Sequence, residues 1–527
     1  MDTPRIEVPD QFNVATAMVD ENVTSGRGDR VAIYYGEQRF TYRDVQSMVN
    51  KMGNALKGLG LEPEQRVLLL LLDCPEFVAS FFGAIKIGAV PIPTNTMMKP
   101  ADYEYFLNDS RAPVLVVQDS LLEVIEPIRK NLKYVRQIVV VGEPAKGYPS
   151  YNELTAKASA DLKAAETSKD DSAFWLYSSG STGFPKGAVH LHHDIIYAVD
   201  LYARQVLGIT ENDIMFSAAK LFFAYGLGNN LYFPFRVGAA AVLYPGRPLP
   251  DKMFEVITRY RPTIYYGVPT LYGSMLQYKE DLEKANPEMK KVNELSSVRL
   301  CVSAGEALPA DIFNRWKEKF GVEILDGIGS TEVLHIFLSN RPAQVNPGSS
   351  GTLVPGYEAR IVDEKGIEQP VGEIGNLMIK GESTCAYYWN KHQKTKETIL
   401  GEWINTGDKY YQDKDGYFWY CGRADDMLKV GGIWVSPVEV ENTLIEHSAV
   451  LESAVVGHVD EEGLVKPKAF VVLKPGYKGN PDLAGELQNF VKSKIALYKY
   501  PRWIEFVDEL PKTATGKIRR FVLRSKG

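Results

Sequence analysis

The sequence predicts an α/β protein whose sheets are mostly parallel and covered by helices on both faces. Up to about residue 140, short apolar runs alternate with amphipathic stretches, which is the pattern of strands connected by crossover helices. The runs are apolar at nearly every position, as expected for strands buried on both faces. With 527 residues the chain is too long for one compact core, so we expect at least two domains.

The elements of the first unit follow in a regular order. We expect a helix at residues 76–87 and strands at residues 67–72, 89–92, 114–117 and 138–141. Residues 143–172 are polar, which indicates a surface connection. A short aromatic strand is expected directly after it, at residues 173–177.

Two further units continue the pattern. The second has a helix around residues 253–259 and strands at residues 240–243, 263–266 and 298–302. A small final unit has strands at residues 453–456 and 469–473 and a helix within residues 483–495.

Composition narrows the class of protein. A net charge of −6 gives no reason to expect a nucleic acid or an acidic membrane as partner. The four cysteines lie far apart, which fits a reducing compartment and excludes the usual zinc patterns. The first residues contain no apolar signal core, and the longest clean apolar run, residues 67–72, is too short to cross a bilayer. We therefore expect a cytoplasmic protein without a membrane partner.

One loop carries more chemistry than any other stretch. Residues 177–187 read Tyr-Ser-Ser-Gly-Ser-Thr-Gly-Phe-Pro-Lys-Gly and follow directly on an expected strand. Glycines let a backbone approach a bulky anion, and consecutive N–H groups can line an anion site. The hydroxyls add neutral donors and the lysine adds positive charge, so the loop is suited to a polyphosphate. Its candidate ligands are Ser178, Ser179, Gly180, Ser181, Thr182, Gly183 and Lys186.

Two other glycine motifs do not match this loop. A Walker loop needs Gly-Lys-Ser/Thr, but Lys186 stands between Pro185 and Gly187. A nucleophile elbow needs Gly-x-Ser-x-Gly, and no serine of the loop is in that frame. A flexible surface turn is the remaining alternative, and the strand that runs directly into the loop argues against it.

The loop strongly resembles the phosphate loop of the adenylate-forming superfamily, which contains acyl-CoA synthetases, adenylation domains of peptide synthetases and luciferases. Further motifs of the superfamily follow in order, so the resemblance spans roughly residues 25 to 525. It implies a large N-terminal domain, residues 1–422, of layered α/β sheets with a β-rich subdomain. A small, mobile α+β C-terminal lid domain, residues 423–527, is expected to follow, with its hinge near Asp425.

Two segments at expected strand ends are implied to hold the nucleotide. They are residues 303–309 and 326–332, and open α/β sheets bind ligands at such ends. By resemblance, Thr331 touches the α-phosphate and Glu332 binds magnesium, which suits a hard carboxylate. Where the superfamily usually has an adenine-stacking tyrosine, this chain has Ile328. The implied ATP-binding residues are Gly305, Glu306, Ala307, Asp326, Gly327 and Ile328, with Asp408 and Arg423 at the ribose.

The segment at residues 420–441 resembles the hinge between the two domains, with Asp425 as the pivot. Its paired glycines offer a backbone without side chains where the pantetheine arm of coenzyme A could pass. Residues 511–517 resemble the motif that carries the adenylation lysine, here Lys517, which joins Thr331 and Glu332 as implied catalytic residues. The implied coenzyme A contacts are Lys429, Gly431, Gly432 and Trp434.

Substrate choice is implied to depend on residues 220–226 and on residues around the Thr-Glu pair. By resemblance, Phe223 forms an aromatic gate. An amino-acid adenylation domain would have an aspartate where this chain has Ala224, so an amino acid is disfavoured. Aromatic walls suit an aromatic ring, although core packing is the alternative for Tyr266. The implied substrate-binding residues are Phe223, Ala224, Tyr225, Tyr266, Gly329, Leu334 and His335.

The motif set looks closest to benzoate–CoA ligases, which implies a reaction in two steps. A carboxylate, benzoate or a near relative, displaces pyrophosphate from ATP, and the thiol of coenzyme A then displaces AMP. ATP, magnesium and coenzyme A are the implied cofactors, and a homodimer is compatible with this interpretation.

Three alternatives stay open. The acid could be 4-hydroxybenzoate, 2-aminobenzoate or a medium-chain fatty acid. A peptide-synthetase adenylation domain would need an adjacent carrier domain, and the chain ends at Gly527 without one. A non-catalytic nucleotide-binding protein would not need both Glu332 and Lys517.

A second polar cluster, His-Leu-His-His-Asp at residues 190–194, has two interpretations. Three histidines and an aspartate suggest a metal site, but no further His or Cys cluster completes a ligand set. The start of a helix, with Asp194 near its N-terminus, is the favoured interpretation.

Overall fold

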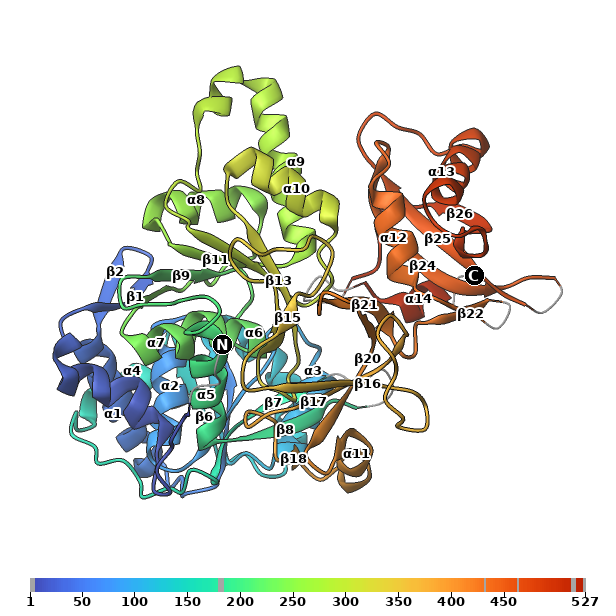
Figure 1. Cartoon of the computed structure of the whole chain (residues 1–527). Coiled ribbons are helices and arrows are strands. Elements are labelled where there is room, and N and C mark those ends of the chain that lie inside the picture. Colours follow the sequence, from blue (N-terminus) through green and yellow to red (C-terminus); the bar gives the residue numbers. More distant parts are fainter. Residues whose placement is uncertain (1–4, 179–183, 431–432, 462–463, 513–517, 525–527) are drawn as a thin grey trace.

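The structure of the chain is a computed structural model that describes residues 5–178, 184–430, 433–461, 464–512 and 518–524 (Figure 1). Its architecture is mixed α/β. Layered sheets and their helices form the larger part, and a smaller body lies at its side, coloured orange to red in Figure 1. The predicted fold class is confirmed. No helix among the described residues has the length and apolar character needed to span a bilayer.

The largest sheet lies at the centre of the larger part. Its strands run parallel from β13 to β1, and antiparallel strands close both edges. In spatial order the strands are β15 (Thr352–Leu353), β14 (Ile336–Ser339), β13 (Ile324–Gly329), β12 (Leu300–Ser303), β11 (Ile264–Gly267), β9 (Ile214–Ser217), β10 (Ala240–Val242), β1 (Val31–Tyr35) and β2 (Gln38–Thr41).

The central strands β9, β10, β11 and β12 are buried on both faces, and this explains why they are apolar at successive positions. Tyr265 and Cys301 face a cluster formed with α8 (Pro250–Tyr260), α9 (Pro269–Ala285) and α10 (Ala310–Phe320). The neighbouring residues Tyr266 and Val302 belong to the main core on the opposite face. A strand alternates its side chains between faces, so the central strands β9, β10, β11, β12 and β13 each contribute to both clusters.

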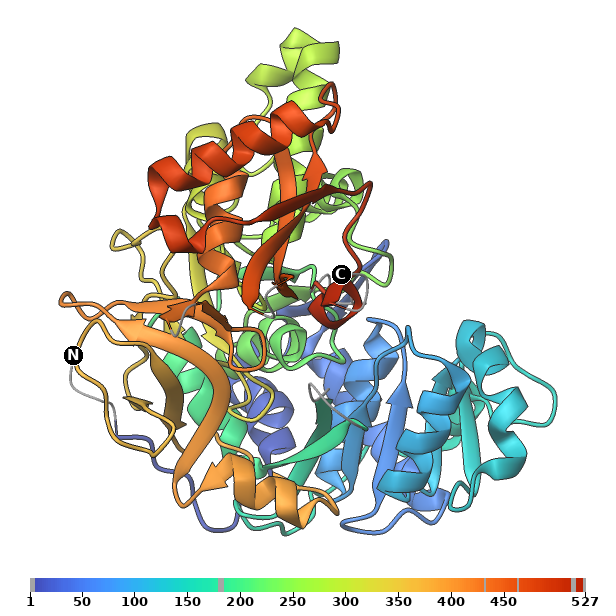
Figure 2. The ribbon, with the colours of Figure 1, turned by 90° about the vertical axis from the view of Figure 1, so that its right-hand side faces the viewer.

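A second, all-parallel sheet accounts for the first predicted unit. It has the order β4 (Val90–Pro93), β3 (Arg66–Leu70), β5 (Val114–Gln118) and β6 (Gln137–Val141). One face joins the main core with α1 (Tyr42–Gly58) and α2 (Pro75–Lys86), and the other packs on α3 (Pro100–Ser110). In Figure 2 this sheet and its helices lie at the lower right.

Two antiparallel sheets complete the larger part. A short one consists of β7 (Ser172–Ser178), β8 (Lys186–Leu191) and β18 (Tyr387–Tyr388). The other contains β16 (Glu358–Val362), β17 (Gly375–Lys380), β20 (Trp403–Gln412) and β19 (Ile399–Leu400), with β21 (Phe418–Arg423) paired to β20.

The smaller body has its own sheet and its own core. Strands β24 (Val450–Val459), β25 (Val465–Leu473) and β26 (Trp503–Phe506) pair in that order. Helices α12 (Pro437–Ile445) and α13 (Pro481–Lys494) contribute Val440, Leu444 and Leu487 to a cluster separate from the main core.

The polar connection before the phosphate loop differs from expectation. Residues 143–172 include a helix, α4 (Tyr151–Lys157), whose Tyr151 is buried in the main core. The run of Lys, Asp and Ala residues obscures this helix, because Tyr151 is its buried residue and Leu154 is only partly buried against the core.

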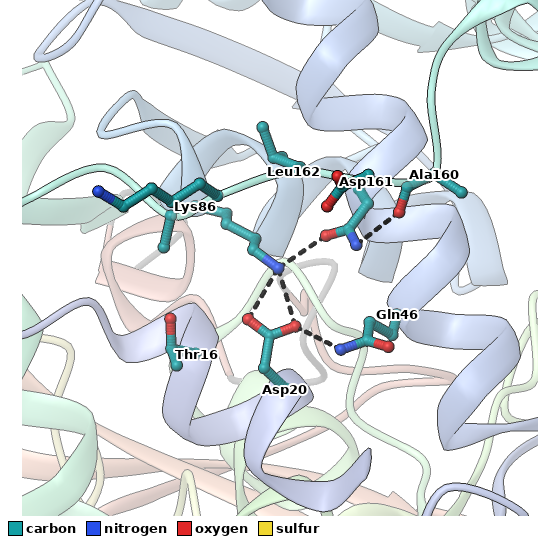
Figure 3. Close-up of a pocket in the computed structure, with 10 residues that line it drawn as sticks. Thr16, Asp20, Gln46, Lys86, Ala160, Asp161 and Leu162 are labelled. Atoms are coloured by element: carbon teal, nitrogen blue, oxygen red, sulfur yellow. Dashed lines mark hydrogen bonds and ion pairs between the residues drawn. The ribbon is translucent and has the colours of Figure 1, made fainter. Parts of the chain in front are cut away.

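A buried lysine also ties this connection to the N-terminal helices (Figure 3). The Lys86 ammonium lies 2.7 Å from both Asp20 Oδ2 and Asn50 Oδ1, and Asn50 in turn donates to the Ala160 carbonyl at 2.8 Å. The cavity beside it, of about 640 Å³, shares no lining residue with the site described below. Since the charged groups are paired with each other, we interpret this network as a structural anchor.

Candidate active site

The phosphate loop is mounted on a tight antiparallel hairpin. Ser178 ends β7 and Lys186 begins β8, and the two are cross-strand partners. Ser179, Gly180, Ser181, Thr182 and Gly183 lie outside the described residues. The hairpin therefore fixes both ends of the loop next to each other.

Glu332 connects three segments that are far apart in sequence. Its Oε1 accepts a hydrogen bond from Ser178 Oγ at 2.9 Å and from the Tyr388 hydroxyl at 2.7 Å. Lys186 Nζ donates to that hydroxyl at 3.4 Å and lies 4.4 Å from the centre of the Tyr388 ring. The two described ends of the predicted phosphate loop, Ser178 and Lys186, thus lie close to the predicted magnesium ligand.

The charges at this junction influence one another. Burial lowers the pKa of Lys186, and the nearby Glu332 carboxylate partly opposes that shift. Burial and Glu332 together raise the pKa of Tyr388, so its hydroxyl stays protonated and able to donate. Sequence reasoning missed Tyr388, because it is 56 residues from Glu332 and belongs to no motif. Its signal would have been a short aromatic strand, which pairs with β8 at Ala188.

The two nucleotide segments lie at the ends of adjacent parallel strands. Ser303 and Asp326 are register partners on β12 and β13, so the two segments begin side by side. Strand β12 ends at Ser303, whereas β13 continues to Gly329 and pairs there with β14. Asp326 is buried, which raises the pKa of its carboxyl to about 8, and it accepts a hydrogen bond from Leu308 N at 3.3 Å. Asp326 therefore holds the first segment, which contains Gly305, Glu306 and Ala307.

Close packing of backbone accounts for two of the predicted glycines. A Cβ at Gly327 would lie 2.6 Å from the Leu338 carbonyl oxygen, and one at Gly329 would lie 2.5 Å from the His335 carbonyl oxygen. Both contacts arise where β13 pairs with β14. Ile328 between them is partly buried and packs against the main core.

The predicted ribose ligands form one ion pair. Asp408 and Arg423 are cross-strand neighbours on β20 and β21, and Arg423 Nη1 donates to Asp408 Oδ1 and to the Thr406 carbonyl, both at 2.9 Å. The Asp408 charge raises the pKa of the Arg423 guanidinium, and burial opposes this effect. Gly407 has φ of +73°, and a Cβ there would lie 2.8 Å from Arg423 Nη2. Glycine at position 407 therefore both permits the turn and leaves room for the Arg423 side chain.

Three of the predicted substrate residues, Tyr225, Tyr266 and His335, form one aromatic cluster. The Tyr225 hydroxyl lies 3.1 Å from the Val302 carbonyl and 3.2 Å from that of Gly267. The centres of the Tyr266 and His335 rings lie 6.3 and 5.7 Å from the centre of the Tyr225 ring. Burial lowers the pKa of His335 to about 3, so its ring is neutral.

These residues divide into two layers. Phe223, Ala224 and Tyr225 are partly exposed, with the last two on α6 (Ala224–Leu227). Tyr266, Leu334 and His335 are at most 2% exposed, so they form the layer behind. Leu334 also has φ of +71°, a conformation in which a leucine is strained. Tyr266 is therefore packed in the core, as the alternative interpretation expects. Its ring also packs against the ring of Tyr225.

The smaller body reaches the nucleotide segments through its last described stretch. The Ile518 backbone N–H donates to Glu306 Oε1 at 3.0 Å. The predicted hinge residue Asp425 is exposed, and its carbonyl accepts from Arg524 Nη2 at 3.0 Å. Lys517, Gly431 and Gly432 lie outside the described residues, as do the side chains of Lys429 and Trp434.

The histidine cluster follows the helix interpretation. Helix α5 (His192–Ala198) starts here, and Asp194 Oδ2 accepts a hydrogen bond from Leu191 N at 3.1 Å in its first turn. Across the described ranges, no group of three or more His, Cys, Asp or Glu side chains is arranged to hold a metal ion.

The fold and the arrangement of these motifs define the class of protein as a nucleotide-dependent enzyme in two parts. Comparisons with known proteins then identify its family. The AMP-binding enzyme family matches residues 19–389, and its C-terminal domain matches residues 439–517. The chain belongs to the AMP-binding enzyme family. The predicted membership of the adenylate-forming superfamily is confirmed.

Individual relatives are similar over the whole chain. Benzoate–CoA ligase from Thauera aromatica is 53% identical over 99% of this chain and 97% of its own. A 4-hydroxybenzoate–CoA/benzoate–CoA ligase from Rhodopseudomonas palustris is 44% identical over 97% of this chain and 94% of its own.

Among solved structures, the anthranilate CoA ligase AuaEII in complex with anthranoyl-AMP has a TM-score of 0.93 and 48% identity, covering 98% of both chains. A benzoate CoA ligase from Burkholderia xenovorans LB400 has a TM-score of 0.89 and 47% identity, covering 97% of this chain and all of that one.

Proposed function

We propose that this chain is an ATP-dependent acid–thiol ligase that joins an aromatic carboxylate, benzoate, to coenzyme A and releases AMP and pyrophosphate. The observation that carries the proposal is the 53% identity to a benzoate–CoA ligase over 99% of the chain. The junction of Ser178, Lys186 and Glu332 supports it, because a cation, hydroxyl donors and a carboxylate meet beside the phosphate loop.

In the first step, the benzoate carboxylate attacks the α-phosphate of ATP and pyrophosphate leaves. Charge develops on the phosphoryl oxygens, so donors and cations that are already in position do most of the work. Lys186 and the loop residues bind the polyphosphate, Thr331 contacts the α-phosphate, and Asp408 and Arg423 hold the ribose. Residues 303–309 and Ile328 line the adenine.

Glu332 is the proposed magnesium ligand, and its surroundings fit that role. Ser178 and Tyr388 both donate to Oε1 and so fix the orientation of the carboxylate. One carboxylate suits magnesium that takes its other ligands from phosphate oxygens and water. When bound, the ion would neutralise charge on the phosphates.

The second step needs a different arrangement of the two parts. We assign residues 1–422 to the N-terminal domain and residues 423–527 to the lid, with the hinge near Asp425. Lys517 would serve adenylation, and the contact between Glu306 and Ile518, next to Lys517 in sequence, supports its approach to the nucleotide segments. Rotation of the lid would withdraw Lys517 and bring Lys429, Gly431, Gly432 and Trp434 to the thiol of coenzyme A.

The acid site is built for an aromatic ring without an ammonium group. Tyr225 and the buried layer behind it supply apolar, aromatic walls, and Ala224 supplies no charge to pair with an α-amino group. The four cysteines are free and buried, which supports the proposed cytoplasmic location. A second candidate acid is 2-aminobenzoate, favoured by the similarity to the anthranilate CoA ligase.

A panel assay tests the proposal. Purified protein with magnesium and ATP is given benzoate, 2-aminobenzoate, 4-hydroxybenzoate or hexanoate, and pyrophosphate release, acyl-AMP and acyl-CoA are followed separately. Benzoate should give the highest kcat/KM. The difference from a substituted ring should correspond to about 1–3 kcal/mol, the usual value of a small group in an apolar site. Failure to form an acyl-AMP from any acid would overturn the proposal, and a preference for 2-aminobenzoate would replace the substrate.

A further inference from the structure

We propose that His190, oriented by Asp194, is a positioning residue that holds the Thr331–Glu332 turn against the nucleotide. The inference rests on the proposed function, because it takes Thr331 and Glu332 as the residues that face the phosphates and magnesium. It concerns a polar cluster of the sequence that the proposed reaction leaves without a role.

The imidazole of His190 bridges two polar groups inside the protein. His190 and Asp194 are both fully buried. Ring atom Nδ1 lies 2.7 Å from Asp194 Oδ2, and ring atom Nε2 lies 2.8 Å from the carbonyl oxygen of Thr331. His190 and Thr331 are 141 residues apart, so the contact joins the end of the phosphate-loop hairpin to the turn after β13.

Hydrogen-bond chemistry determines which atoms carry the protons in the contacts among Asp194, His190 and Thr331. A carbonyl oxygen can only accept, so Nε2 carries a hydrogen and donates it to Thr331. A contact of 2.7 Å between Nδ1 and a carboxylate oxygen also requires a proton between them. The same Oδ2 accepts from Leu191 N, which anchors the carboxylate at the start of α5. Asp194 thus orients the ring and secures donation from Nε2.

Neighbouring contacts leave the ring little freedom. The Phe174 ring is stacked on it at a centre-to-centre distance of 5.3 Å and an interplanar angle of 19°. On the other side of the aspartate, His193 Nε2 lies 3.1 Å from Asp194 Oδ1. Packing and two polar contacts therefore define one position for Nε2.

The turn that His190 holds needs such support. Thr331 and Glu332 follow the strand β13, and the turn closes at Leu334, which has a strained positive φ. The backbone of this turn is held from two sides, by His190 at the Thr331 carbonyl and by Cys385 N at the Glu332 carbonyl at 2.7 Å. A shift of the turn would move both side chains from the phosphates, and small displacements of positioned groups cost much catalytic rate.

Matched substitutions separate the two ring contacts. His190→Gln keeps a donor close to the place of Nε2, whereas His190→Asn keeps a donor near Nδ1 and loses the contact with Thr331. By analogy with other residues that orient ligands from behind, we expect His190→Asn to lower the kcat of adenylation by about 10–100-fold. His190→Gln should recover most of the rate, and the KM for coenzyme A should stay at the wild-type value in both.

A change at Asp194 tests the proton chain. In Asp194→Asn the amide oxygen takes the place of Oδ2, because Leu191 N donates there, so Nδ1 must donate and Nε2 is left without a hydrogen. This is the wrong tautomer for Thr331, and adenylation should fall. In His190→Gln the same Asp194→Asn change should have no further effect. Thermal unfolding of each variant shows whether it is folded.

A spectroscopic readout does not depend on activity. In protein with ¹⁵N-labelled histidine, the resonance that disappears in His190→Gln should belong to a ring whose Nε2 carries a hydrogen, and Asp194→Asn should remove that hydrogen. An unprotonated Nε2 in the wild type, or full adenylation activity in folded His190→Asn, would overturn the inference. If the wild type forms acyl-AMP but gives either of these results, the positioning role of His190 is refuted and the proposed function is not. If the wild type forms no acyl-AMP from any acid, the proposed function is refuted, and the ¹⁵N measurement still tests the protonation of His190.

Discussion

The nucleotide side and the acid side of the candidate site are built in different ways. On the nucleotide side, polar groups such as Ser178, Lys186 and Glu332 are half-buried and form a short chain of hydrogen bonds. On the acid side, Tyr266 and His335 are buried and contact Tyr225 through ring packing. The proposed nucleotide side is thus held together by directional hydrogen bonds, and the proposed acid side by ring packing.

One turn belongs to both sides. Thr331 and Glu332 belong to the second nucleotide segment. Leu334 and His335, two and three positions after Glu332, are buried, and the His335 ring packs near Tyr225. A substitution on the nucleotide side alone should therefore change the rate of adenylation and leave the KM for the acid unchanged. A substitution on the acid side alone should raise the KM for the acid.

Loss of Lys517 should have the largest effect and leave the acid side untouched. A preorganised cation that meets developing charge is worth about 10²–10³-fold or more in rate, so Lys517→Ala should reduce adenylation by at least that factor. The same variant should still convert supplied benzoyl-AMP and coenzyme A to the thioester. Rapid-quench measurement of both half-reactions checks this, and an equal loss in both would contradict the division of labour.

Removal of the Tyr388 hydroxyl should slow adenylation without changing the binding of the acid. Tyr388→Phe deletes one of the two donors to Glu332 Oε1, and a hydrogen bond to a charged group is worth about 1.5–3 kcal/mol. The kcat of pyrophosphate release should fall accordingly, while the KM for benzoate should not change. Tyr387→Phe, at the exposed neighbouring position, is the matched control. A higher KM for benzoate in Tyr388→Phe would show that the two sides are not separable.

A methyl group at Gly228 should disturb the acid side alone. A Cβ there would lie 2.4 Å from Cδ2 of His335, so Gly228→Ala must displace the ring. Overpacking of this kind costs about 1–3 kcal/mol, which should appear as a higher KM for benzoate and a lower melting temperature. Gly485→Ala, where a Cβ would meet nothing within 4 Å, makes the same chemical change as a control. An unchanged KM for benzoate would place His335 outside the acid site.

The smallest expected effect is on stability as a function of pH. Burial raises the pKa of Asp326 to about 8 from an ordinary 3.8, so the folded state binds a proton that the unfolded state releases. Unfolding free energy should therefore fall as pH rises between these two values and level off above pH 8. His192 and His335, whose pKa values are lowered, act in the opposite direction only below about 6.5.

The comparison is best made between pH 6.5 and 8, where the histidines no longer contribute. Urea unfolding of wild type should show a greater loss of stability across this window than Asp326→Asn. Equal slopes would mean that the Asp326 carboxyl is ionised in the folded protein at neutral pH.

Much of the nucleotide side could be predicted from sequence, because its residues lie in short contiguous motifs. In residues 177–187 the order of glycines, hydroxyl residues and a lysine already indicates an anion site. The strands were predictable for a similar reason, since burial on both faces leaves a continuous apolar run. The predicted ends of β3 and β12 differ from the observed ends by one or two residues, because the end of a strand depends on its pairing with neighbouring strands.

Sequence by itself determined the family, most of the strands and helices of the α/β units, and the local motifs that we propose to hold phosphate and ribose. Tertiary structure alone decided that Tyr388 and Ser178 share the Glu332 carboxylate, that His190 reaches the Thr331 carbonyl, and that Tyr266 lies behind Tyr225. The physical reason is range. Turn geometry and strand periodicity act over a few residues, whereas these contacts join positions tens to hundreds of residues apart, and packing of the folded core selects them.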